Sequence, residues 1–125
     1  MFKAVEDIPR GAPVGLFFEG EAGKARYDTV SGKNYLGIAD RDIGRGEFFD
    51  FGVLVRSGVV YGVLDKQLGG EEVEAGDQLF IGEGKLSLKM PDVHLARVVL
   101  VGMALNKKDL LAYWQYVGQV STEKK

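Results

Sequence analysis

Cysteine is absent from this 125-residue sequence, which also has only one histidine and three prolines. The lack of cysteine excludes disulfide bonds and metal sites held by thiolates. A histidine-based metal site would need carboxylate partners that the sequence does not place beside His94. We therefore expect no metal ion and no cofactor, and we expect His94 to be a solvated residue in a surface turn.

Long apolar runs and an excess of one charge are also missing. No run approaches the roughly 20 residues that span a bilayer, and residues 1–9 are too polar for the core of a signal peptide. Acidic and basic residues are interspersed, with a formal net charge of −2, and no basic patch typical of a nucleic-acid binder is evident. We expect a soluble protein that is not classically secreted and binds neither membrane nor nucleic acid.

Catalytic motifs are missing as well. The sequence has no Gly-x-Ser-x-Gly elbow, no His-Glu-x-x-His helix and no Walker-type phosphate loop. Its spacing places neither an acid–base pair nor a nucleophile–base pair. We expect the protein not to be an enzyme; a carboxylate pair that only the fold assembles is the alternative.

Glycine, in contrast, is abundant, with 18 residues that stand singly between apolar runs. This pattern is typical of the turns and bulges of a β protein. The length and the 46% hydrophobic content suit one domain with its own core. We expect a mainly β domain over residues 14–118, an N-terminal arm or edge strand over 1–13, and a flexible tail over 119–125.

Residues 47–64 form the predicted spine of this domain, because they are rich in aromatic and β-branched side chains. Alternate residues from Phe49 to Val55 should share one face. The run is too long for one strand, so we expect a bend or turn at Ser57–Gly58. Apolar runs and alternation predict further strands at 14–18, 24–30, 34–39, 78–81, 85–90 and 96–104.

Two pairs of these strands are predicted hairpins, 24–30 with 34–39 and 78–81 with 85–90. In the second hairpin, Leu86, Leu88 and Met90 should face the core. Residues 96–104 are nearly all apolar, which predicts a central strand or one buried on both faces.

The period changes near the C-terminus, where Leu110, Trp114 and Val117 recur at helical spacing. We expect one short α-helix over residues 107–117, with Trp114 covering an open end of the β domain. Tyr113 and Tyr116 should be its exposed aromatic residues, available to a partner.

A faint internal repeat runs through the chain. Residues 9–17 resemble residues 74–80, and Gly11 precedes Gly37 by the same interval as Gly76 precedes Gly102. Two similar β-units flanking the spine predict a small antiparallel β-barrel or β-tulip-like domain, closed or nearly closed.

The loop over residues 40–47 places three acidic side chains around two glycines, an arrangement that could offer oxygen ligands to Ca²⁺. Its spacing does not match the EF-hand loop, and Arg41 and Arg45 offset the negative charge. We favour a solvated loop with local ion pairs.

Three segments, in this order along the chain, resemble the small capsid decoration (cement, or head-stabilising) proteins of tailed bacteriophages. They are Tyr-Leu-Gly-Ile-Ala-Asp at 35–40, the apolar strand at 51–61 with its Arg-Ser-Gly step, and the Ala-Gly-Asp, strand, Gly-Lys hairpin at 74–86. The predicted C-terminal helix with its Tyr-Trp-Gln-Tyr departs from that pattern.

The resemblance implies a non-enzymatic structural protein of the virion, made in the host cytoplasm and located on the capsid exterior. It would bind the major capsid protein and bridge neighbouring subunits, acting as a trimer or dimer. The alternative is a small β-barrel adaptor, or a ligand- or peptide-binding subunit, of a tail, baseplate or other assembly, and an enzyme is the least favoured reading.

Candidate partner-binding residues are chosen for charge, expected exposure and the lack of an evident core role. Those in the N-terminal segment and the 40–46 loop should touch the capsid or a neighbouring copy. The candidates are Phe2, Lys3, Val5, Arg41, Asp42, Arg45, Tyr113 and Tyr116.

Overall fold

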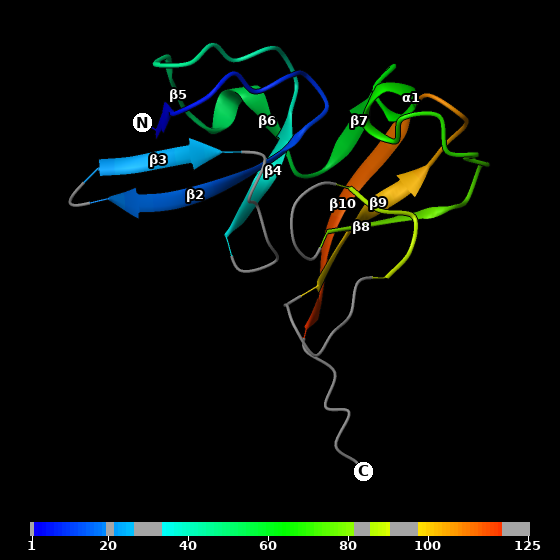
Figure 1. Cartoon of the computed structure of the whole chain (residues 1–125). Coiled ribbons are helices and arrows are strands. Elements are labelled where there is room, and N and C mark those ends of the chain that lie inside the picture. Colours follow the sequence, from blue (N-terminus) through cyan, green and yellow to red (C-terminus); the bar gives the residue numbers. More distant parts are fainter. Residues whose placement is uncertain (1, 20–21, 27–33, 82–85, 91–97, 119–125) are drawn as a thin grey trace.

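A computed structural model describes residues 2–19, 22–26, 34–81, 86–90 and 98–118; within these ranges, the side chains of residues 17–19, 22–26 and 116–118 are not described. Two sheets lie next to each other (Figure 1). The first has the order β5-β1-β3-β2-β4-β6 and the second the order β7-β10-β9-β8. The expected mainly β class is therefore confirmed.

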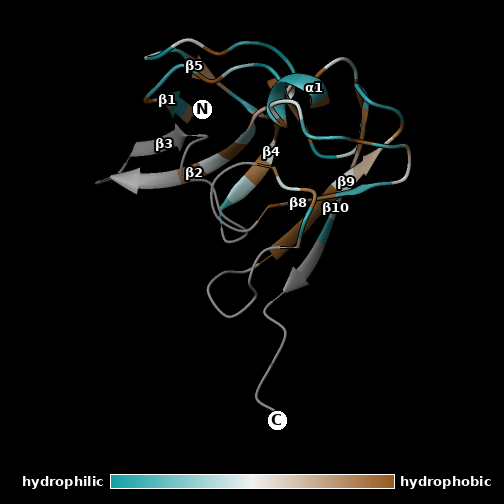
Figure 2. Ribbon diagram, turned by 45° about the vertical axis from the view of Figure 1, so that its right-hand side comes forward, coloured by the Kyte–Doolittle hydropathy of each residue, from teal (hydrophilic) through white to brown (hydrophobic). Residues whose placement is uncertain are grey.

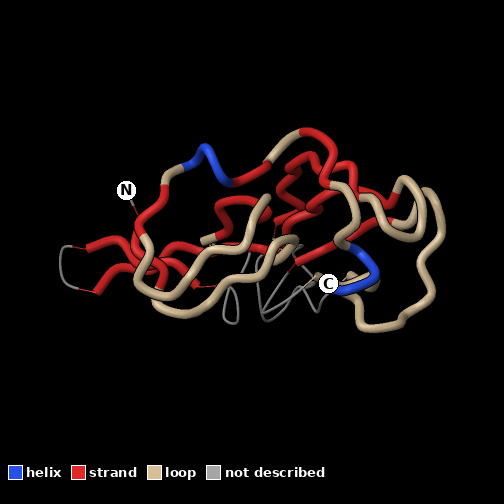
Figure 3. Tube along the Cα trace, turned by 90° about the horizontal axis from the view of Figure 1, so that it is seen from above, coloured by secondary structure: helices blue, strands red, loops and turns tan. Residues whose placement is uncertain are grey.

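The strands of the first sheet are β1 (Phe2–Ala4), β2 (Pro13–Glu19), β3 (Ala22–Arg26), β4 (Tyr35–Ala39), β5 (Phe48–Phe49) and β6 (Leu54–Val55). Those of the second are β7 (Gly58–Val60), β8 (Gln78–Ile81), β9 (Val98–Ala104) and β10 (Leu110–Gly118). All pairings are antiparallel except the parallel pair β1–β3. A 3₁₀ turn, η1 (Phe51–Val53), and a short helix, α1 (Leu64–Gln67), lie far apart (Figure 3).

The expected closed barrel is wrong, because the described strands form two open sheets. The bend predicted at Ser57–Gly58 is present, and it carries the chain from β6 of the first sheet to β7 of the second. Gly58 has a φ of +130°, a backbone conformation that suits glycine. The bend therefore separates two sheets instead of closing one.

The expected C-terminal helix over 107–117 is also wrong, since residues 110–118 form the nine-residue strand β10 between β7 and β9. Register shifts after Ala112 and after Tyr116 break the alternation of a regular strand, so the apolar residues mimic helical spacing. Trp114 is 42% exposed and covers no open end.

The N-terminal segment is not an arm or an edge strand. β1 lies between β5 and β3, and Ala4, Ile8 and Ala12 are fully or almost fully buried. These three apolar side chains form part of a core, although charged residues lie between them in the sequence. Removal of the N-terminal segment would therefore open the first sheet.

Of the two predicted hairpins, the first is wrong and the second is present in part. β3 and β4 do not pair with each other, because β2 lies between them and pairs with both. In the second hairpin Phe80 pairs with Ser87 and Leu86 is buried, but Met90 is 49% exposed. The last predicted strand is confirmed as β9, which is almost entirely buried. His94 and the tail over 119–125 lie outside the described residues.

The predicted spine consists of short pieces. Phe49 is buried, whereas Phe51, which was expected on the same face, is 53% exposed. Between them, the carboxylate of Asp50 accepts a hydrogen bond from the Gly52 N–H at 2.9 Å and caps η1. This cap turns the chain out of the extended conformation, so the strand alternation does not continue to Phe51.

The internal repeat is confirmed by strand register. In the β2–β4 ladder Val14 pairs with Gly37, and in the β8–β9 ladder Leu79 pairs with Gly102. A register shift follows directly after Val14 and after Leu79. The two units therefore share even their bulge.

One pair of backbone hydrogen bonds occurs three times in the structure, once in each unit of the repeat and once more between Ala4 and residues 46–47. A buried alanine accepts from the N–H of a glycine with φ near +90° and donates to the carbonyl of the residue after that glycine. The pairs are Ala39 with Gly11–Ala12, Ala4 with Gly46–Glu47, and Ala104 with Gly76–Asp77, at 2.7–2.9 Å. Glycine is favoured in each pair because its backbone has a positive φ.

The main core lies against the second sheet and extends into the first through Tyr35 and Ile38. A smaller cluster in the first sheet includes Ile8, Ile43 and Phe49. Figure 2 shows the continuous hydrophobic stretch of β9. Because the larger core draws side chains from both sheets, the two units form one folded body.

Gly37 and Gly102 occupy equivalent positions in the two units, but substitution by alanine should destabilise the fold to different extents at the two positions. A Cβ at Gly102 would lie 2.1 Å from the carbonyl oxygen of Leu111, whereas at Gly37 the nearest atoms would be 3.2 Å away. We expect Gly102→Ala to lower the free energy of unfolding by about 3 kcal/mol and Gly37→Ala by about 1 kcal/mol. Urea denaturation of both variants measures this difference, and equal losses would contradict it.

Candidate interaction surface

Two loops with the same sequence pattern face each other in the first sheet. Residues 7–11 and 42–46 both read Asp-Ile-x-Arg-Gly. Ile8 and Ile43 exchange backbone hydrogen bonds at 2.8 and 2.9 Å. The sequence pattern itself could have revealed this pairing, which we did not predict.

The same loops exchange side-chain contacts. The Asp42 carboxylate accepts from the Arg10 backbone N–H, and the Asp7 carboxylate accepts from the Arg45 backbone N–H, both at 2.8 Å. This reciprocity relates the loops by an approximate two-fold rotation. It places the N-terminal segment beside the 40–46 loop, so the candidates from these two segments lie in one part of the molecule.

An exposed aromatic patch lies next to these loops, at the free edge of β5. We define the aromatic edge patch as Phe2, Lys3, Phe48 and Phe51. The Phe48 and Phe51 side chains are 58% and 53% exposed. The Phe2 ring stacks edge-on against Phe51 with centroids 5.2 Å apart, and the Lys3 ammonium lies 5.8 Å from the centroid of Phe48.

The patch is anchored by the core beneath it. The Phe2 centroid is 5.8 Å from that of Phe49, which is almost fully buried. β5 pairs with β1 alone within the described sheet, so its outer edge is open. An exposed apolar patch beside an open strand edge is typical of a protein contact surface. Phe2 and Lys3 were predicted as contact residues, whereas Phe48 and Phe51 were missed because strand alternation does not reveal an edge.

The charged loop over 40–47 is held by its own contacts, as expected. Arg41 forms an ion pair with Glu47, whose other carboxylate oxygen accepts from the Gly44 N–H at 2.9 Å. The hydrogen bond from Arg41, followed by that from Gly44, lowers the pKa of Glu47. Within the described ranges no three acidic or histidine side chains gather as metal ligands.

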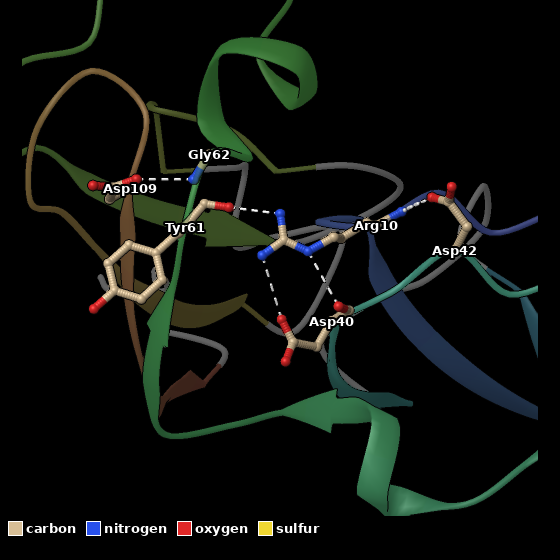
Figure 4. A network of polar contacts seen from close by, with 6 residues as sticks. All are labelled: Arg10, Asp40, Asp42, Tyr61, Gly62 and Asp109. Atoms are coloured by element: carbon tan, nitrogen blue, oxygen red, sulfur yellow. Dashed lines mark hydrogen bonds and ion pairs between the residues drawn. The ribbon is translucent and has the colours of Figure 1, made fainter.

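Arg10, which we did not predict as a site residue, joins the two sheets (Figure 4). Its Nη1 donates to the Tyr61 carbonyl at 2.6 Å and its Nε to the Asp40 carbonyl at 3.1 Å. Its Nη2 lies 3.5 Å from the Asp40 carboxylate. On the second sheet, the neighbouring Gly62 N–H donates to Asp109 at 2.8 Å.

The remaining candidates have other environments. Val5 is half-buried in the bend that follows β1. Tyr113 is half-buried on β10 and packs against a small cluster that contains Phe80. Tyr116 pairs with Val99 through its backbone, and its side chain is not described. Because β10 belongs to the second sheet, the two tyrosines are not part of the aromatic edge patch.

Acid should weaken two of the loop contacts described above. Hydrogen bonds from Arg41 to Glu47 and from Asn106 to Asp109 are the leading causes that lower the pKa of each carboxyl. A lowered folded-state pKa contributes stability that is present above the unfolded-state pKa of about 4 and is lost as the pH falls through the folded-state pKa. We expect the urea midpoint to fall between about pH 5 and pH 3.

The double variant Glu47→Gln/Asp109→Asn tests whether these two carboxylates cause the loss of stability in acid. Its midpoint should be lower at neutral pH and should change less on acidification than that of the parent chain. Glu71→Gln is the matched control, because the Glu71 carboxylate is exposed and makes no hydrogen bond within the described part of the chain. An unchanged acid profile in the double variant would contradict the assignment.

Comparison with known proteins adds no relative from which a role could be transferred. No protein-family model matches the chain, and the searches of curated proteins and of solved structures found no match. Among the described residues, no helix is long and apolar enough to cross a membrane. Function has to be inferred from the surfaces of the chain itself.

Proposed function

We propose that this chain is a non-enzymatic structural protein that binds the outside of an assembled bacteriophage capsid and bridges neighbouring capsid subunits. The aromatic edge patch, next to the preformed charged loops, is the observation that supports a binding role most directly. The capsid as partner is supported by the resemblance of the segments at 35–40, 51–61 and 74–86 to decoration proteins.

Aromatic side chains at the centre of a contact and charged ones at its rim are the usual composition of a protein interface. Phe51, stacked against Phe2, exposes an aromatic ring on one face of the β1–β5 ladder, and Phe48, beside Lys3, exposes one on the other face. The open edge of β5 offers backbone groups to a partner strand. The patch is thus suited to an extended segment of a shell subunit.

Preorganisation supports the same role. The loops at 7–11 and 42–46 are fixed by reciprocal backbone and carboxylate hydrogen bonds, so little entropy is lost when they meet a partner. A protein that binds the assembled shell and not the free subunit stabilises the shell by mass action. Many copies, bound as oligomers across neighbouring subunits, multiply that effect.

Removal of the N-terminal segment would not test the proposal, since Ala4 and Ile8 are buried and the first sheet would open. Substitution of exposed aromatic residues avoids this problem. Phe48→Ser/Phe51→Ser should preserve the fold and reduce attachment to empty capsids of the phage that encodes the chain by about tenfold or more, because truncation of central aromatic residues removes most of the energy of a contact.

Co-sedimentation with empty capsids, with unassembled capsid subunits and with isolated tails measures the effect. Met90→Ser/Leu105→Ser is the matched control, as it also removes two exposed apolar side chains, at sites outside the patch. Undiminished attachment of the Phe48/Phe51 variant would overturn the assignment of the patch. Attachment to tails alone would replace the capsid with another part of the virion.

A further inference from the structure

The main-chain groups of β5 face in two directions. The Ala4 N–H donates to the Glu47 carbonyl, and the Ala4 carbonyl accepts from the Gly46 N–H, so both groups of Ala4 face the chain that leads into β5. Successive residues of a strand direct these groups to opposite sides, so those of Lys3 face β3. Phe48 is the residue opposite Lys3 in the antiparallel β1–β5 ladder. Its N–H and carbonyl therefore face away from β1, towards the open edge.

Phe48 is the one residue of β5 with both main-chain groups at this edge. Phe49, the other residue of the strand, pairs with Phe2, so its groups face β1. Within the described part of the chain, no strand lies beyond β5, and no hydrogen bond outside the ladder reaches Phe48. The edge thus presents one donor and one acceptor, both on the same residue.

Such an edge is complementary to a second copy of itself. In an antiparallel sheet, two residues that form a hydrogen-bonded pair exchange both N–H···O bonds, and a two-fold axis relates them. Two Phe48 residues fit this arrangement. A parallel alignment of two β5 strands would instead require the Glu47 carbonyl and the Phe49 N–H, which face β1. The backbone therefore favours antiparallel pairing about an axis through the two Phe48 residues.

The aromatic side chain at the axis suits the same pairing. The Phe48 ring is 58% exposed and has the Lys3 ammonium group 5.8 Å from its centroid, on the side away from the edge. Directly opposite residues of an antiparallel pair place their side chains on the same face, and aromatic pairs stabilise such positions. Pairing would therefore cover two exposed rings as well as two sets of main-chain groups.

The residues on either side of the axis are compatible with a second copy. The two-fold axis brings Asp50 of each copy opposite Gly46 of the other, next to Arg45. Asp50 keeps an extended backbone, with φ −127° and ψ −171°, and a Cβ at Gly46 would meet nothing within 4 Å. In the described part of the chain, neither the Asp50 carboxylate nor the Arg45 guanidinium forms an ion pair. Opposite charges therefore meet across the axis.

We propose that the free chain forms a two-fold dimer in which the β5 strands of two copies pair antiparallel and the two Phe48 residues exchange main-chain hydrogen bonds. The two six-stranded sheets then form one continuous sheet. Because β5 has only two residues, the contact is small and the dimer weak.

This inference goes beyond the proposed function, because it concerns the chain away from any capsid. One edge accepts one strand at a time, so the dimer has to open before a segment of a shell subunit adds to β5. Until then the dimer covers an edge that would otherwise associate with other exposed strands.

Sedimentation velocity of the full chain, from about 10 µM to about 1 mM, tests the dimer at the concentrations where small interfaces associate. The apparent mass should rise from that of one chain towards that of two and no further, because a two-fold pair is closed.

Two substitutions of Phe48 separate the hydrogen bonds from the ring. Phe48→Pro removes the ring and the outward N–H, which the β1–β5 ladder does not use, whereas Phe48→Ala removes only the ring. Dimerisation of Phe48→Pro should be weaker than that of Phe48→Ala by about tenfold or more, since two hydrogen bonds are lost in each dimer. Urea denaturation of both variants verifies that they fold.

Cross-linking tests the position of the axis and does not depend on the folding of Phe48→Pro. Opposite residues of a hydrogen-bonded pair have Cα atoms about 5.5 Å apart, a separation that suits a disulfide. The chain has no cysteine of its own, so Phe48→Cys introduces a single thiol. Under mild oxidation it should form covalent dimers about tenfold faster than Tyr61→Cys, because pairing raises the local thiol concentration. Tyr61 is the matched control, since it is 63% exposed and follows β7 of the second sheet.

Four results would overturn the proposal. They are a chain that stays monomeric up to the highest concentration, association into trimers or larger species, equal dimerisation of Phe48→Pro and Phe48→Ala, and equal cross-linking of Phe48→Cys and Tyr61→Cys. Capsids are not used in these experiments. A monomeric chain that attaches to capsids would therefore remove this inference and leave the proposed function in place.

Discussion

The fold depends on one backbone contact used three times, between a buried alanine and a glycine with a positive φ. Ala4, Ala39 and Ala104 each accept a hydrogen bond from such a glycine and donate one to the residue that follows it. The alanine side chains are at most 1% exposed, so little space is available at these contacts. Each contact fixes where a loop leaves the sheet.

The candidate surfaces follow from this constraint. Gly46 forms its contact with Ala4 two residues before Phe48, which places β5 beside β1 and leaves its other edge without a described partner strand. Gly11 forms the contact with Ala39 directly after Arg10, whose side chain then reaches the carbonyl of Tyr61 on the second sheet. The aromatic edge patch and the Arg10 contact between the two sheets are thus positioned by neighbouring copies of one motif.

The sequence predicts what local chemistry controls. Single glycines between apolar runs indicate the β class, and the matching intervals of Gly11–Gly37 and Gly76–Gly102 reveal the repeat. Long-range pairing is not visible in this way: β2 separates β3 from β4, and bulges in β10 give its apolar residues a helical spacing. Exposure of Phe51 depends on the Asp50 cap, and the role of Arg10 depends on the position of the other sheet.

The junction made by Arg10 has a consequence for resistance to acid. Its two hydrogen-bonded acceptors are main-chain oxygens of Tyr61 and Asp40, which do not titrate, and a guanidinium keeps its charge while carboxylates become protonated. The contacts of Glu47 and Asp109, in contrast, depend on ionised carboxylates. Mild acidification would therefore loosen the outer loops first, while the two halves of the molecule stay locked together.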